Sequence, residues 1–166
     1  MLRPFSLSLA GVFSAYLIGG IIWGLVLRPP LHGTREADGI AIHSTVGSSP
    51  EFLGFLGFTG LSILIAGVVT FITFSRARPS LALMCWLVVL TFLGGYIFVL
   101  AGDFFGHLRY PLGDFNSIPE GEDVLLLPAA SPGLGAHLGA PFIAALSYWS
   151  GLLLEPAPRS LPSAHS

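Results

Sequence analysis

Residues 81–110 read LALMCWLVVLTFLGGYIFVLAGDFFGHLRY, and this stretch decides the fold class. No charged residue occurs from position 81 to position 102, and Asp103, His107 and Arg109 then follow within two helical turns. About twenty apolar residues in an α-helix, which rises about 1.5 Å per residue, cover the ~30 Å hydrocarbon core of a bilayer. The stretch therefore predicts a membrane-spanning helix whose polar end marks the membrane surface.

The composition of the whole chain supports this prediction. The 166 residues are 53% hydrophobic and 10% charged, and the mean hydropathy is +0.80; soluble domains have about 25% charged residues. The net charge of −2 and the absence of lysine argue against a protein that binds nucleic acid. The single cysteine, Cys85, excludes an intramolecular disulfide and a cysteine-rich metal cluster. The class that remains is an integral membrane protein.

Three further apolar runs complete a prediction of four transmembrane helices. We expect an all-α antiparallel bundle that forms one membrane domain over residues 1–166. Its predicted spans are residues 7–27, 52–74, 81–102 and 133–154. Residues 75–80, SRARPS, form a short link, which predicts that the second and third spans are an antiparallel hairpin.

Small residues recur at every fourth position of the first span, at Gly11, Ala15 and Gly19 and again at Gly20 and Gly24. This spacing predicts a helix face that approaches a neighbouring helix closely in lipid. The span itself has a signal peptide as its alternative, since a positive charge precedes it. Its length and the lack of a small-residue cleavage site argue against that alternative.

Three polar segments connect or follow the spans. Residues 28–51 and 103–132 are predicted to be outer loops, and residues 155–166 a polar tail. Within the loops, residues 40–42 are expected to form a short strand. Residues 124–127 are too short to span and are expected to pack on the helix ends.

The arginines favour an orientation with both termini in the cytoplasm. Arg3, Arg76, Arg78 and Arg159 lie on the side of the termini, and the compact link that holds two of them is typical of a cytoplasmic loop. The other side carries most of the acidic residues. The complete replacement of lysine by arginine suggests GC-rich coding, which fits a bacterial inner membrane.

Asp103, His107 and His137 are the candidate site residues. Asp103 and His107 are four positions apart, so a continuing helix places them on one face. His137 lies about one turn into the fourth span from the same side. If all three meet at the outer rim, they offer ligands for copper or zinc, and the two histidines offer ligands for a haem iron.

A purely structural interpretation of the same residues stays open. Asp103, His107 and Arg109 are typical of the place where a helix leaves the bilayer, paired with one another and with lipid headgroups. For His137 this interpretation is a hydrogen bond to a backbone carbonyl that Pro141 leaves open. An ionisable residue inside a span is nevertheless a functional candidate.

The sequence contains no phosphate-binding loop, nucleophile elbow or zincin motif. It therefore favours a non-catalytic accessory subunit of a larger membrane complex, expected to be a bioenergetic one of the respiratory or photosynthetic electron transport chain. The expected partners are other integral membrane subunits and the lipid bilayer, and no cofactor is the first expectation. The alternatives are a small redox protein with haem or copper between His107 and His137, and a small channel or carrier.

Overall fold

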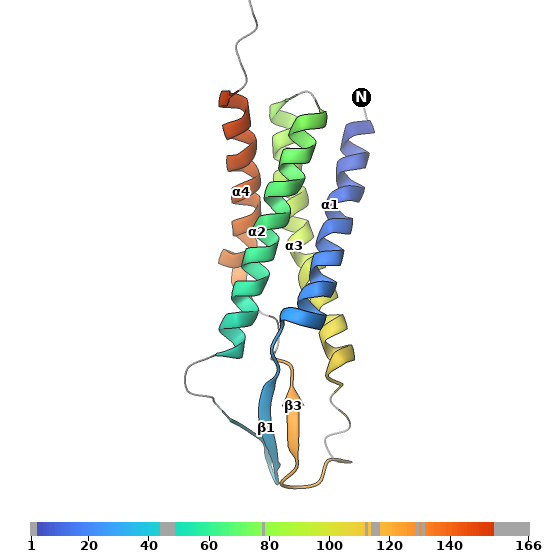
Figure 1. The fold of residues 1–166 in the computed structure, drawn as a ribbon, viewed down its shortest axis with the longest axis vertical. Helices are drawn as coiled ribbons and strands as arrows, with labels where there is room; N and C mark the ends of the chain where they lie inside the picture. Colours follow the sequence, from blue (N-terminus) through green and yellow to red (C-terminus); the bar gives the residue numbers. More distant parts are fainter. Residues whose placement is uncertain are drawn as a thin grey trace, which may run out of the picture.

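The computed structural model describes residues 3–43, 49–77, 79–111, 113, 117–128, 130 and 132–154, and for residues 3–5 and 7 the backbone alone. Within these ranges, four long helices form a bundle, and a three-stranded sheet lies beyond one end of it (Figure 1). The helices are α1 (Arg3–Ile22), which a π-helical turn, η1 (Trp23–Leu27), continues, α2 (Pro50–Arg76), α3 (Leu81–Arg109) and α4 (Gly133–Leu154). By length and composition, the four helices of the described chain can each cross a membrane.

The four predicted spans are all helical, and the fourth has the predicted bounds. The largest difference is in α3, which continues past the predicted end at residue 102 to Arg109. The extra turns have tertiary partners, since Gly106 is buried, and a Cβ placed there would lie 2.6 Å from Leu127 Cδ2. The predicted outer loop at 103–132 thus begins with helix.

The helices follow the ring order α1, α3, α4, α2, so that parallel helices lie side by side. The short link makes α2 and α3 run in opposite directions, as predicted. They face each other across the bundle, however, and their main neighbours are α4 and α1. The predicted hairpin is therefore correct in direction but not in packing.

Glycine brings α1 into backbone contact with α3. A Cβ on Gly20 would collide with the carbonyl group of Phe98, and a Cβ on Gly24 with that of Gly102. Gly11, by contrast, has nothing within 4 Å of its Cβ position. The predicted close approach is therefore confirmed for the face with Gly20 and Gly24, and Gly11 points into open space.

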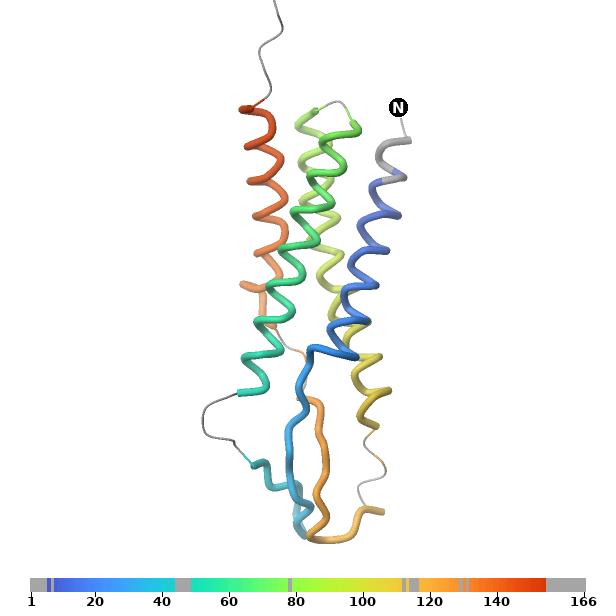
Figure 2. The backbone as a smooth tube through the Cα atoms, in the orientation of Figure 1, coloured from blue at the N-terminus to red at the C-terminus, as the bar shows by residue number. Residues whose placement is uncertain are grey.

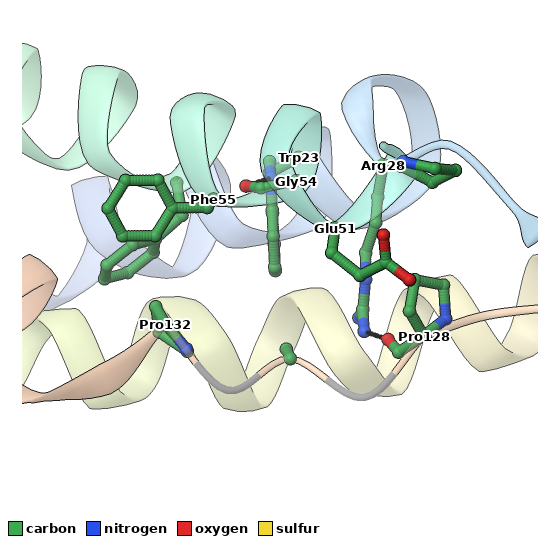
Figure 3. A pocket seen from close by; sticks show the side chains of 10 residues that line it. Trp23, Arg28, Glu51, Gly54, Phe55, Pro128 and Pro132 are labelled. Atoms are coloured by element: carbon green, nitrogen blue, oxygen red, sulfur yellow. Dashed lines mark hydrogen bonds between the residues drawn. The ribbon is translucent and has the colours of Figure 1, made fainter. Parts of the chain in front are cut away.

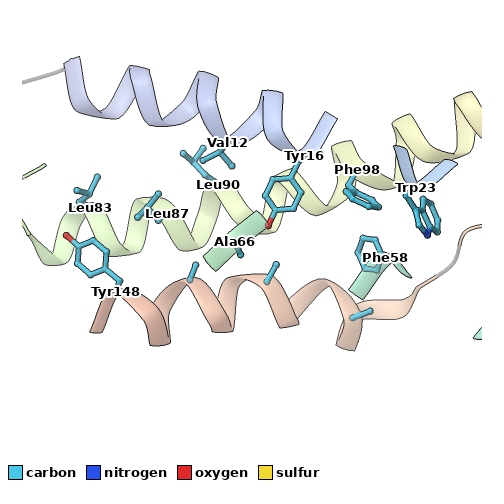
Figure 4. Close-up of a cluster of buried hydrophobic side chains, with 13 residues drawn as sticks. Val12, Tyr16, Trp23, Phe58, Ala66, Leu83, Leu87, Leu90, Phe98 and Tyr148 are labelled. Carbon is cyan, nitrogen blue, oxygen red and sulfur yellow. The ribbon is translucent and has the colours of Figure 1, made fainter. Parts of the chain in front are cut away.

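Large buried side chains fill the centre of the bundle (Figure 4). Among them, the hydroxyl of Tyr16 donates a hydrogen bond to the carbonyl oxygen of Ser62 at 3.2 Å. The hydroxyl of Tyr148 donates to the carbonyl oxygen of Ser80 at 3.1 Å and accepts from its N–H at 2.8 Å. Buried polar groups need internal partners, and these bonds connect α1 to α2 and α4 to the start of α3.

The sheet consists of β1 (Leu31–Glu36), β2 (Gly39–Ile42) and β3 (Asp123–Leu126), in the antiparallel order β2-β1-β3. The strand predicted at residues 40–42 is confirmed. The all-α prediction missed the sheet as a whole, because β1 and β3 pair although they are far apart in sequence. Each strand is also too short to show a clear two-residue period.

Figure 2 shows that the described start of α1 and the adjoining ends of α2 and α3 lie at the end of the bundle opposite the sheet. We call the sheet end the outer end and the opposite end the inner end. The same view shows that α3 reaches further toward the sheet than the start of α4. This stagger determines how deep the residues of α4 lie.

Candidate functional site

Arg28 is the centre of the polar contacts at the outer end. Its side chain is buried, 3% exposed, and its Nη1 donates to Asp103 Oδ1 at 2.5 Å. Its Nη2 donates to the carbonyl oxygen of Pro128. The guanidinium carbon also lies 5.0 Å from the centre of the Trp23 ring, within range of a cation–π interaction. One side chain thus joins the end of α1, the outer end of α3 and the segment after β3.

The π-helical turn gives Arg28 this position. The backbone N–H of Arg28 donates a hydrogen bond to the carbonyl oxygen of Trp23, five residues earlier, at 3.0 Å. This spacing aligns the side chains of Trp23 and Arg28 on one face. Pro29 has no N–H, so it cannot donate the backbone hydrogen bond that the carbonyl oxygen of Leu25 would normally accept. The guanidinium of Arg109, on α3, donates to the Leu25 carbonyl oxygen instead. Arg109 therefore satisfies a carbonyl group that the end of the helix leaves without a backbone partner.

A small cavity lies between Arg28 and the start of α2 (Figure 3). Its volume is about 80 Å³, whereas cofactor sites typically have about 300–1,000 Å³. Trp23 Nε1 closes one side by donating to the Gly54 carbonyl oxygen at 3.1 Å, and Glu51 borders the cavity beside Arg28. The cavity therefore suits a few water molecules rather than an organic cofactor.

Asp103 and His107 lie one turn apart on α3, as predicted, but they do not pair through their side chains. The carboxylate of Asp103 binds Arg28. The exposed imidazole of His107 contacts the backbone carbonyl oxygen of Asp103, to which its Nδ1 donates at 2.8 Å. The pairing of these residues with lipid headgroups stays a prediction, and the ion-pair partner of Asp103 is Arg28, which the sequence did not reveal.

His137 lies inside the bundle and not at the outer rim. It is 8% exposed, and its ring centre is 4.5 Å from that of Tyr96 and 5.2 Å from that of Phe58. Its Nδ1 donates to the carbonyl oxygen of Gly133 at 3.0 Å, so Nδ1 carries a proton. Its Nε2 is buried without a partner among the described residues. The predicted hydrogen bond from His137 to a backbone carbonyl is present. Its acceptor is the carbonyl oxygen of Gly133 and not the carbonyl that Pro141 leaves open.

The three predicted ligands therefore do not meet. His137 contacts α3 at Gly95, with Cδ2 3.3 Å from the Cβ position, and His107 follows twelve residues later, about 18 Å along the helix axis. Two imidazoles that share one iron must approach it to about 2 Å each. No group of three His, Cys, Asp or Glu side chains in the described part of the chain is placed to hold a metal ion.

A second polar cluster, which the sequence did not indicate, lies on the sheet. Thr34 Oγ1 donates to Asp123 Oδ1 at 2.9 Å, and His43 Nε2 donates to Thr34 Oγ1 at 2.6 Å. A hydroxyl nucleophile needs the opposite arrangement, in which histidine accepts the hydroxyl proton. The cluster therefore connects β1 with β3 and the end of β2 and does not activate Thr34.

We expect His137→Phe to change the free energy of unfolding by less than about 1 kcal/mol, because phenylalanine keeps the ring between Tyr96 and Phe58 and removes an unpartnered nitrogen. His137→Ala should cost about 2–3 kcal/mol, because it leaves a cavity. Unfolding in mixed micelles, followed by circular dichroism, measures both values. A loss of stability in His137→Phe as large as that in His137→Ala would show that the polar bonds of the imidazole, such as the one from Nδ1 to the Gly133 carbonyl oxygen, matter more than its packing.

Comparison of the chain with protein-family models, with characterised proteins and with solved structures finds no match.

Proposed function

We propose that this chain is an integral membrane protein that serves as a non-catalytic subunit of a larger membrane complex and contacts its partner with the outer sheet. The observation that carries this proposal is the attachment of the sheet to the bundle through buried Arg28, which binds Asp103 on α3 and Pro128 after β3. A polar module fixed in this way presents a constant surface, as recognition by a partner requires.

The exposed side chains of the sheet support the same proposal. Leu125 is 42% exposed, although it lies beyond the helices that would be covered by lipid, and its register partner on β1 is the exposed His32. We propose Leu125 as the apolar residue at the centre of the contact, since the fully buried core of a protein interface is more apolar than its rim. The orientation we propose places the sheet outside a bacterial inner membrane and both termini in the cytoplasm, since the compact link that carries Arg76 and Arg78 is typical of a cytoplasmic loop. A bioenergetic complex is the partner we propose.

Gentle extraction from the native membrane, followed by gel filtration with absorbance detection, tests this function. We expect the chain to elute with other integral membrane subunits. In the Leu125→Glu variant, the fraction of the chain that elutes without partners should be at least tenfold larger than in the wild type, because the substitution places a charge in the contact. Ile42→Glu is the matched control, as Ile42 is 56% exposed and its register partner is Gly33, which puts it on the opposite face of the sheet from Leu125. A chain that elutes alone under the mildest conditions would overturn the proposal.

The redox alternative keeps one observation in its favour. The Nδ1 of His137 donates to a carbonyl oxygen and its Nε2 has no partner among the described residues, which is how many metal-bound histidines are held. A small particle with a Soret band that His137→Phe abolishes would favour this alternative. The channel or carrier alternative remains a prediction from the sequence.

A further inference from the structure

A groove separates α1 from α2 at the inner end of the bundle. Its volume is about 630 Å³, and α1 lines it with small residues from Ser8 to Ala15 while α2 lines it from Val68 to Arg76. Small side chains on α1 do not fill the space, and a Cβ added at Gly11 would meet nothing within 4 Å. The side chains that line the groove therefore leave it open to the surface of the bundle.

The length of the groove matches one leaflet of a bilayer. Its α1 and α2 walls extend about 10–14 Å at 1.5 Å per residue, roughly half of the ~30 Å hydrocarbon core. The groove ends near mid-membrane, where the Tyr16 hydroxyl bonds to Ser62 and Ile65 packs at Gly19. A transmembrane helix of a partner would need a face about twice as long, whereas an acyl chain of one leaflet fits this depth.

The charge at the mouth of the groove is positive. Arg76 is the one charged residue among those that line it, is exposed, and pairs with no acidic residue that the structure describes. The sequence has no acidic residue between Glu51 and Asp103, so neither α2 beyond its first turn nor the first part of α3 offers Arg76 a counter-ion. Basic residues beside a pocket between helices favour anionic lipid headgroups.

We propose that this groove, bounded by Gly11, Ala15 and Val69 and closed at its mouth by Arg76, binds one anionic phospholipid of the inner leaflet. One acyl chain lies between α1 and α2, and the phosphate accepts hydrogen bonds from the guanidinium of Arg76. The small side chains of α1 give the acyl chain its space, and the arginine selects the headgroup. This site is independent of the outer sheet and of any partner that the sheet binds.

Native mass spectrometry of the purified chain tests the site, with phosphatidylglycerol and phosphatidylcholine of identical acyl chains as the probes. We expect one phosphatidylglycerol to be retained about fivefold more strongly than phosphatidylcholine, which corresponds to one arginine near the headgroup. Arg76→Gln should abolish this preference. Gly11→Leu should reduce the retention of both lipids by filling the groove.

Gly60→Leu is the matched control, because Gly60 is exposed on α2 outside the groove and its Cβ position is equally open. It should keep the preference of the wild type. Equal retention of both lipids by the wild type, or a preference that survives Arg76→Gln or Gly11→Leu, would overturn the proposal. So would release of a second copy or of a partner helix by Gly11→Leu without any change in bound lipid.

Discussion

Asp103→Leu is expected to lower the free energy of unfolding by about 3 kcal/mol, because it leaves the Arg28 guanidinium buried without its anion. Breaking a buried ion pair from one side typically costs about 3–5 kcal/mol. The lower end applies here, since the Asp103 side chain is 37% exposed and solvent screens part of the interaction. Unfolding in mixed micelles, followed by circular dichroism, gives the value.

The double variant Arg28→Met/Asp103→Leu separates the charge effect from packing. It removes both charges, so we expect it to be more stable than Asp103→Leu alone by about 1–2 kcal/mol. The double variant also lacks the hydrogen bond from Arg28 to the Pro128 carbonyl oxygen, so protease should cleave its sheet faster than that of the wild type. Arg109→Met is the control, since this exposed arginine donates to a single carbonyl group, and it should cost less than about 1 kcal/mol. A double variant less stable than Asp103→Leu would contradict the assignment of Arg28 as the central contact.

Gly20→Ala and Gly24→Ala should each cost about 2 kcal/mol, and their combination less than the sum of the two, because both force the same separation of α1 from α3. The added Cβ atoms would collide with backbone carbonyl groups of Phe98 and Gly102, and backbone atoms cannot rotate away as side chains can. The helices α1 and α3 must then separate, which loosens the packing between Trp23 and Phe98, whose ring centres are now 5.5 Å apart. Overpacking of this kind typically costs about 1–3 kcal/mol per site.

Gly11→Ala is the matched control for these variants, because the same small side chain enters open space on the same helix. It should leave stability unchanged or raise it by up to about 1 kcal/mol through helix propensity. The comparison uses the same unfolding measurement for all four variants. If Gly11→Ala destabilised the chain as much as Gly24→Ala, the loss would come from the helix itself and not from the contact with α3.

The candidate site was only partly predictable. The sequence correctly placed Asp103 and His107 one turn apart, because the periodicity of a single helix is a local property. It did not reveal that Asp103 pairs with Arg28, since 75 positions separate the two residues and nothing local connects them. The prediction that His137 lies at the outer rim was wrong for a related reason. Its depth depends on how far α3 and α4 are shifted along each other, which the length of either helix alone does not determine.

The sequence by itself determined the four apolar helices, the bounds of α4, the opposite directions of α2 and α3 and the small-residue spacing of α1. Each of these depends on hydropathy, periodicity or link length within one segment. Only the tertiary structure decided which small-residue face meets a neighbour, so that Gly24 lies against α3 while Gly11 opens into a groove. It also decided that β1 pairs with β3 and that Arg28 is buried between them and the bundle. The physical reason is that these contacts join distant segments, and their energies depend on the order and stagger of the helices rather than on the composition of any one of them.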